Sequence, residues 1–64
     1  MNPDIFNTPE AATFLRLSKP TLERLRLTGD GPPYCKLGKA VRYRKSDLDA
    51  WLASRLIRST SEGA

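Results

Sequence analysis

The chain has 64 residues, the size of one domain, and its eleven Lys and Arg residues against seven Asp and Glu residues give a formal net charge of +4. One cysteine and no histidine exclude an intramolecular disulfide and the common zinc sites. No segment approaches the roughly 20 apolar residues that a membrane span needs, and no signal peptide is recognised, so we expect a cytoplasmic protein with an anionic partner.

The first predicted helix follows a short arm of residues 1–5. Asn7 is a favourable N-cap, and Glu10 stands at the capping-box position three residues later. Phe6 is placed to pack back onto the helix as a hydrophobic staple. The apolar residues that follow continue the helix, and we expect it to stop near Arg16.

A second helix is predicted after a very short connection, with Ser18 as its N-cap. Helical spacing turns Leu22 and Leu25 toward the core. Leu27 points away from it, and the sequence leaves open whether it packs under the next element or against a partner copy. The run "TGDGPPY" cannot continue a helix and is typical of a turn.

Two short strands, Tyr34–Leu37 and Val41–Arg44, are predicted next, joined by the three residues 38–40 as a hairpin. In the second strand Val41 and Tyr43 alternate with Arg42 and Arg44, which predicts an apolar face and a cationic face. Cys35 is interpreted as an ordinary strand residue rather than a reactive thiol.

Ser46 is the predicted N-cap of a third helix, with Asp49 at its capping-box position. Trp51 is expected to anchor this helix under the first two. The predicted apolar stripe consists of Leu48, Trp51, Leu52 and Leu56. Residues 59–64 are expected to form a flexible tail.

This order predicts a mostly α fold with a small β-hairpin, a winged helix-turn-helix: helix, tight turn, helix, two-stranded wing and third helix. We expect residues 1–58 to form one DNA-binding domain. In such folds the second helix enters the major groove and phosphate contacts fix its register. The predicted DNA-binding residues are Ser18, Lys19, Pro20, Thr21, Glu23, Arg24, Lys36, Lys39, Arg42 and Arg44.

Each residue of this set has a predicted role. Arg24 can donate two hydrogen bonds to a guanine edge, and Glu23 can accept one from cytosine N4. Ser18 and the helix N-terminus can hold a phosphate. The four wing cations are expected to share one face and to neutralise phosphates. The competing interpretation is an ordinary amphipathic helix with a solvated charged face, followed by a hairpin whose charges prevent edge pairing.

The sequence offers no catalytic site, metal site, cofactor site or small-molecule site. There is no histidine, no Ser or Cys with a visible base partner, and no glycine-rich phosphate loop. Asp47 and Asp49 are close together, but capping of the third helix explains both. We therefore expect a protein that is not an enzyme.

The segments "FNTPEAATFLRLSKPTLERLR" and "GDGPPYCKLGKAVRYRKSDLDAWL" resemble the AlpA/excisionase-like branch of the MerR superfamily over about residues 6–55. The resemblance implies a winged helix-turn-helix of a mobile genetic element that binds double-stranded DNA. Members act as excisionases (recombination directionality factors), which bend DNA beside an attachment site, or as small transcriptional regulators. Arg16 departs from the family, which commonly has glycine there.

Excisionase is the leading hypothesis and transcriptional regulator the first alternative. The expected partners are duplex DNA on the nucleoid, further copies of the chain on adjacent sites and a site-specific recombinase, with no membrane. A protein-interaction module of adaptor or antitoxin type is the second alternative. RNA binding is disfavoured because no exposed aromatic platform for unstacked bases is predicted.

Overall fold

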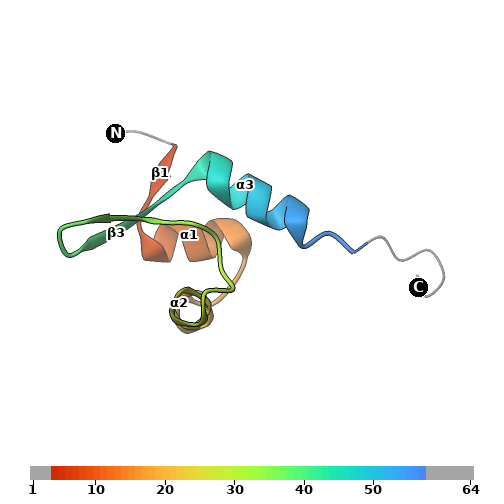
Figure 1. The fold of residues 1–64 in the computed structure, drawn as a ribbon, viewed down its shortest axis with the longest axis horizontal. Helices are drawn as coiled ribbons and strands as arrows, with labels where there is room; N and C mark the ends of the chain where they lie inside the picture. The colour runs from red at the N-terminus through yellow and green to blue at the C-terminus, as the bar shows by residue number, and fades with distance from the viewer. Residues whose placement is uncertain (1–3, 58–64) are drawn as a thin grey trace.

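A computed structural model describes residues 4–57, and within them three helices pack at one end of a small sheet (Figure 1). The elements are β1 (Ile5–Phe6), α1 (Thr8–Leu15), α2 (Lys19–Thr28), β2 (Cys35–Leu37), β3 (Ala40–Arg44) and α3 (Lys45–Ser54). This order confirms the predicted winged helix-turn-helix. The expected tail, residues 59–64, and the expected domain end at residue 58 lie outside the described residues.

The bounds of α1 follow from its two caps. Asn7 Oδ1 accepts a hydrogen bond from the Glu10 amide at 2.9 Å, and Glu10 Oε1 accepts one from the Asn7 amide at 2.8 Å. The helix ends where Arg16 adopts φ 58° and ψ 38°, and the Leu17 amide then donates to Ala12 O at 2.9 Å. This left-handed cap reverses the chain after one residue, so a tight turn needs no glycine here.

Ser18 caps α2 as predicted, because its Oγ accepts from the Thr21 amide at 3.3 Å. Leu22 is fully buried, but Leu25 is only partly buried and packs against the following loop instead of the core. Gly31 of that loop lies so close that an added Cβ would stand 3.1 Å from Leu25 Cβ. The loop therefore covers the outer side of Leu25.

The sheet contains a strand that sequence reasoning missed. Ile5 and Phe6, predicted as the end of an arm and a staple, pair antiparallel with Arg44 and Tyr43, so β3 lies between β1 and β2. The Lys45 amide extends this ladder to Asp4 O at 2.8 Å. The pairing gives β3 a second neighbour, which satisfies backbone groups that its free edge would expose.

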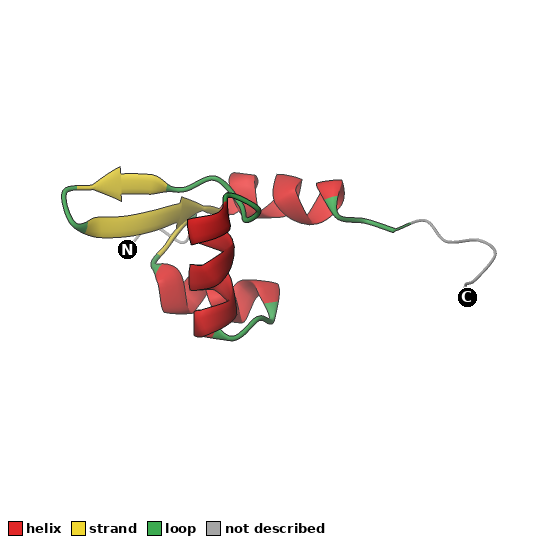
Figure 2. Ribbon diagram, turned by 60° about the horizontal axis from the view of Figure 1, so that its bottom comes forward, coloured by secondary structure: helices red, strands yellow, loops and turns green. Residues whose placement is uncertain are grey.

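The hairpin turn is shorter than predicted. Leu37 pairs with Ala40, so the connection has the two residues Gly38 and Lys39, not three, and Ala40 belongs to β3. Gly38 has φ 66°, as two-residue hairpin turns require at their first position. Figure 2 shows the hairpin extending away from the helices, with its inner end against them.

The predicted cap of α3 is wrong. The helix begins at Lys45, its N-cap is Arg44, and Ser46 lies inside the first turn. The reason is that β3 runs into α3 without a loop, because the β1 pairing holds Arg44 in extended backbone until the helix starts. Asp47 still lies in the first turn, where a carboxylate favours the positive end of the helix.

The core is small and is built mainly around α1, which contacts the other helices and two strands. Its buried members are Ala11, Ala12, Leu15, Leu22, Tyr43 and Leu48. The predicted stripe of α3 is only half correct: Leu48 is buried and Trp51 packs against the core, but Leu52 and Leu56 are 41% and 67% exposed. The second half of α3 extends past α1 (Figure 1), and Leu56 lies beyond the end of the helix at Ser54.

Candidate nucleic-acid interface

Helix α2 has one face buried and the opposite face open. Leu22 is its only fully buried residue, while Pro20, Arg24 and Leu27 are exposed at spacings of four and three residues. Leu27 is 85% exposed, which confirms its outward direction and excludes packing under the hairpin. An outward face of this kind on the second helix of a helix-turn-helix is the one that a DNA groove would meet.

The polar side chains at the start of α2 are not equally available. Ser18 Oγ donates to Thr21 Oγ1 at 2.7 Å and caps the helix, so both hydroxyls are engaged in the capping. Lys19 Nζ lies 3.9 Å from Glu23 Oε2, a long and exposed ion pair. Such a pair stabilises the helix by only a few tenths of a kcal/mol, roughly 0.3–0.5, and would open readily.

Arg24 is the open cation of this face. Its side chain is exposed and makes no hydrogen bond or ion pair with any residue between 4 and 57. A guanidinium held on a helix with its fork free can donate two parallel hydrogen bonds to a guanine edge.

The wing cations do not share one face, which corrects the prediction. Lys36 pairs with Val41, whereas Arg42 pairs with Cys35. Because directly paired residues lie on the same side of a sheet, Lys36 lies on the Val41 side and Arg42 and Arg44 on the other. The two-residue turn sets this register, so an error of one residue in turn length moves Lys36 to the opposite face.

The wing cations also differ in what they contact. Lys36 and Lys39 are exposed and have no ion pair or hydrogen bond within the described part of the chain. Arg42 is partly buried and donates to Val41 O at 2.8 Å. The hairpin tip therefore presents Lys39 to solvent without a competing partner.

Arg44 is held by an intramolecular carboxylate. Its Nε and Nη2 donate to Asp47 Oδ2 and Oδ1 at 2.7 and 3.0 Å, and this hydrogen bonding with the charge of Asp47 raises the pKa of Arg44. Lys45 is held similarly by Asp49 at 2.9 Å, which raises the pKa of Lys45. A phosphate that binds Arg44 must share it with Asp47.

Sequence reasoning missed Arg26. Its Nη1 donates to Thr8 Oγ1 and to the Tyr43 hydroxyl, both at 3.3 Å, and its guanidinium lies 5.8 Å from the centroid of the Tyr34 ring. The signal was available, because Arg26 stands four residues after Leu22 and so shares the inward face of the helix.

Trp51 packs against the core that α1 and α2 help to form, as predicted, and it also anchors the loop that follows α2. Its Nε1 donates to Asp30 O at 3.0 Å, and the Arg55 guanidinium lies 5.3 Å from the Trp51 ring centroid while donating to the same carbonyl oxygen. These contacts fix the segment that leads from α2 to the wing. Trp51 is partly buried.

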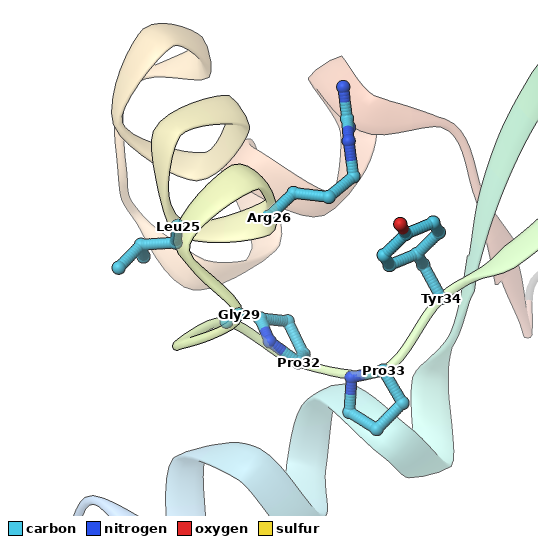
Figure 3. Close-up of a pocket in the computed structure, with 7 residues that line it drawn as sticks. Leu25, Arg26, Gly29, Pro32, Pro33 and Tyr34 are labelled. Atoms are coloured by element: carbon cyan, nitrogen blue, oxygen red, sulfur yellow. The ribbon is translucent and has the colours of Figure 1, made fainter.

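The end of α2 and residues 29–34 line a pocket of about 350 Å³ (Figure 3). Arg26 is the charged residue of its lining, and its guanidinium is engaged by Thr8 and Tyr43. Among residues 4–57 no group of three or more His, Cys, Asp or Glu is placed to hold a metal ion. No helix in that range has the length and hydropathy to cross a bilayer.

The geometry thus provides an outward helix face with an open arginine and a projecting hairpin with an open lysine at its tip. A comparison with protein families finds that residues 5–56 match the model of the family described as "Helix-turn-helix domain". The comparison with curated proteins gives no match.

Proposed function

The chain belongs to the helix-turn-helix domain family, and from this we propose that it binds specific sites on double-stranded DNA through α2 and the wing. The observation that carries the proposal is the open face of α2, opposite the buried Leu22, with Arg24 free at its centre. No catalytic step and no cofactor is part of this function. A position on the nucleoid in the cytoplasm follows from it.

In this proposal the outer face of α2 contacts the bases, and the wing contacts the phosphates. Pro20, Glu23 and Arg24 face the bases, with Lys19, Thr21 and the Ser18 cap at the phosphate that flanks the helix N-terminus. Lys36 and Lys39 hold phosphates from the wing, and Arg42 and Arg44 contribute once they exchange their intramolecular partners for DNA. Arg24 to guanine is the contact expected to discriminate best, by about 1–3 kcal/mol against a wrong base.

The finer proposal is an excisionase that bends DNA beside an attachment site of a mobile element. Leu37 supports the bending, because it is 62% exposed beside the turn at the wing tip. Exposed apolar side chains on minor-groove elements partly unstack base steps and kink the duplex. A small transcriptional regulator is the second candidate, and it uses the same surfaces.

Several copies acting side by side belong to the proposal, because one module of this size buries only about 600–1,000 Å² on DNA. Leu27, Leu56 and Ile57 are exposed apolar residues that a neighbouring copy could cover. Single-copy binding at nanomolar affinity with a Hill slope of one would contradict this part.

The DNA-binding claim is tested by fluorescence anisotropy with a selected DNA site over a range of salt concentrations. Lys39→Ala is expected to lower the magnitude of the slope of log K against log salt by about 0.9, the release expected for one phosphate contact. Arg24→Ala is expected to weaken the selected site more than random DNA. Arg16→Ala removes a charge outside the proposed contact set and serves as the matched control.

If neither Lys39→Ala nor Arg24→Ala changes DNA affinity more than the control does, the interaction-module reading replaces the proposal. The choice between excisionase and regulator needs a different experiment. Fragmented genomic DNA of the source organism is selected on the purified protein and sequenced. Enrichment at repeated motifs beside an integrase gene indicates an excisionase, and enrichment at promoters alone indicates a regulator.

A further inference from the structure

Arg26 joins three parts of the fold at one guanidinium. Nη1 donates to Thr8 Oγ1 at the start of α1 and to the Tyr43 hydroxyl in β3, and the guanidinium faces the Tyr34 ring at the entrance to β2. The Tyr34 and Tyr43 rings are themselves in contact, with centroids 6.1 Å apart. Figure 3 shows the Arg26 side chain leaving α2 on the side of the Tyr34 ring.

Helix α2 packs mainly on α1. Leu22 is its one fully buried residue, Leu25 is partly exposed and contacts the following loop, and Leu27 faces solvent. This packing and the tight turn at Arg16 place α2 relative to α1, but they do not join α2 to the hairpin. Arg26, one turn after Leu22, supplies that attachment through Tyr43 and Tyr34.

The partners of Arg26 connect it to the wing. Tyr43 is fully buried in β3, two residues from Val41 of the hairpin, and Tyr34 directly precedes β2. The inner ends of both wing strands therefore meet the guanidinium. A shift of α2 would break these contacts unless the hairpin moved with it.

We propose that Arg26 is a positioning residue that fixes the DNA-facing surface of α2 relative to the wing without touching DNA itself. The inference rests on the proposed function, since it concerns how two DNA-binding surfaces act together. Two surfaces that engage one duplex behave as linked binding sites, and rigid spacing at the correct distance raises the effective concentration of the second contact.

Tyr43→Phe is the sharpest variant, because it removes only a buried hydroxyl and changes no charge. Thr8→Val removes the other acceptor at nearly constant shape, and Arg26→Met removes the guanidinium. Each is measured by anisotropy on the same DNA, at a temperature where circular dichroism shows the variant fully folded. Arg26→Met and Tyr43→Phe are expected to weaken binding about fivefold to tenfold, the scale of lost preorganisation.

The salt slope separates positioning from direct contact. Positioning leaves the slope of log K against log salt unchanged in Arg26→Met, because no phosphate contact is lost. A fall in its magnitude by about 0.9, as expected for one phosphate contact, would overturn the proposal. Arg16→Met is the matched control, since it removes the same charge and side chain from an exposed position.

A double-mutant cycle with Lys39→Ala tests whether Arg26 acts through the wing. If it does, Arg26→Met weakens binding by a smaller factor once the wing contact is already lost. Full additivity in the cycle, or unchanged affinity in folded Arg26→Met and Tyr43→Phe, would overturn the inference. Failure of the proposed function looks different, because wild type itself would then show no site-specific binding and Lys39→Ala no effect.

Discussion

The conformation of Arg16 shows how a single residue sets the geometry between α1 and α2. Arg16 has φ 58°, and it is the one non-glycine residue with positive φ among residues 4–57. The resemblance described in the sequence analysis implies that glycine is common there, and the left-handed backbone at Arg16 is one that glycine adopts readily. An L side chain in this region costs roughly 1 kcal/mol, so the chain carries some strain in its tight turn.

Arg16→Gly is therefore expected to stabilise the domain by about 1 kcal/mol, because glycine adopts positive φ without a Cβ clash. The free energy of unfolding from urea titration measures it. Ala50→Gly, at an exposed position inside α3, is the control and should destabilise by about 0.5–1 kcal/mol. A lower free energy of unfolding in Arg16→Gly than in wild type would contradict the claim that Arg16 is strained.

Trp51 carries a second residue-scale prediction. Its ring packs against the core and its Nε1 donates to Asp30 O. Trp51→Phe should cost about 1 kcal/mol for the hydrogen bond, whereas Trp51→Ala should cost about 3 kcal/mol, a large part of the stability of a small domain. Thermal melting measures both, and a Trp51→Ala melt within a few degrees of wild type would refute the anchoring role.

The start of each helix depends both on the capping side chain and on the element that precedes the helix. The caps of α1 and α2 form where Asn7 and Ser18 predict them, because each cap residue lies just outside the neighbouring elements and adopts extended backbone. The start of α3 is different. Strand β3 ends at Arg44, which is also the N-cap of α3. The Arg44 side chain makes no capping hydrogen bond to the helix backbone and donates to the Asp47 carboxylate instead.

Arg44→Ser separates the structural role of Arg44 from its proposed DNA contact. A serine at this N-cap gains about 1 kcal/mol, which offsets the 0.2–1 kcal/mol or so of an exposed ion pair, so stability should stay within about 0.5 kcal/mol of wild type. DNA affinity should fall, with a lower magnitude of the salt slope. Arg44→Ala loses the pair without gaining a cap and should be the less stable of the two. Equal stability of both variants would contradict this account of the cap.

At the scale of the whole molecule, the proposed DNA-binding cations lie on two separate surfaces, the outer face of α2 and the hairpin. Their spacing depends on the loop of residues 29–34, which Trp51 and Arg55 bind through Asp30, and on the contacts of Arg26. The basic residues on these surfaces are Lys19 and Arg24 of α2 and Lys36, Lys39, Arg42 and Arg44 of the hairpin. We therefore expect DNA affinity to depend steeply on salt.

Binding should depend little on pH between about pH 6 and pH 9, because the chain has no histidine. The pKa of Lys45 is raised above its ordinary value of 10.5 by Asp49, so the stability from that pair is fully present below about 10.5 and is lost only as the pH rises further. Anisotropy at constant ionic strength measures the affinity across this range. A change of tenfold or more within it would contradict the prediction.

The sequence by itself determined what depends on neighbours along the chain. The caps of α1 and α2, the stop at Arg16 and the glycine-containing hairpin follow from residues within four positions of each other, so the element order and fold class were predictable. The open cation Arg24 and the buried Leu22 follow equally from helical periodicity.

The tertiary structure decided what depends on pairing across the chain. The strand at Ile5, the face of Lys36, the start of α3 and the roles of Arg26 and Trp51 rest on contacts between residues far apart in sequence. A strand of two residues, such as Ile5–Phe6, is too short to show an alternating side-chain pattern in the sequence. In the hairpin, a register change of one residue moves a side chain to the opposite face of the sheet. The local sequence pattern therefore predicts that exposed cationic surfaces exist on α2 and the hairpin. Only the tertiary structure decides which side chains lie together on each of them.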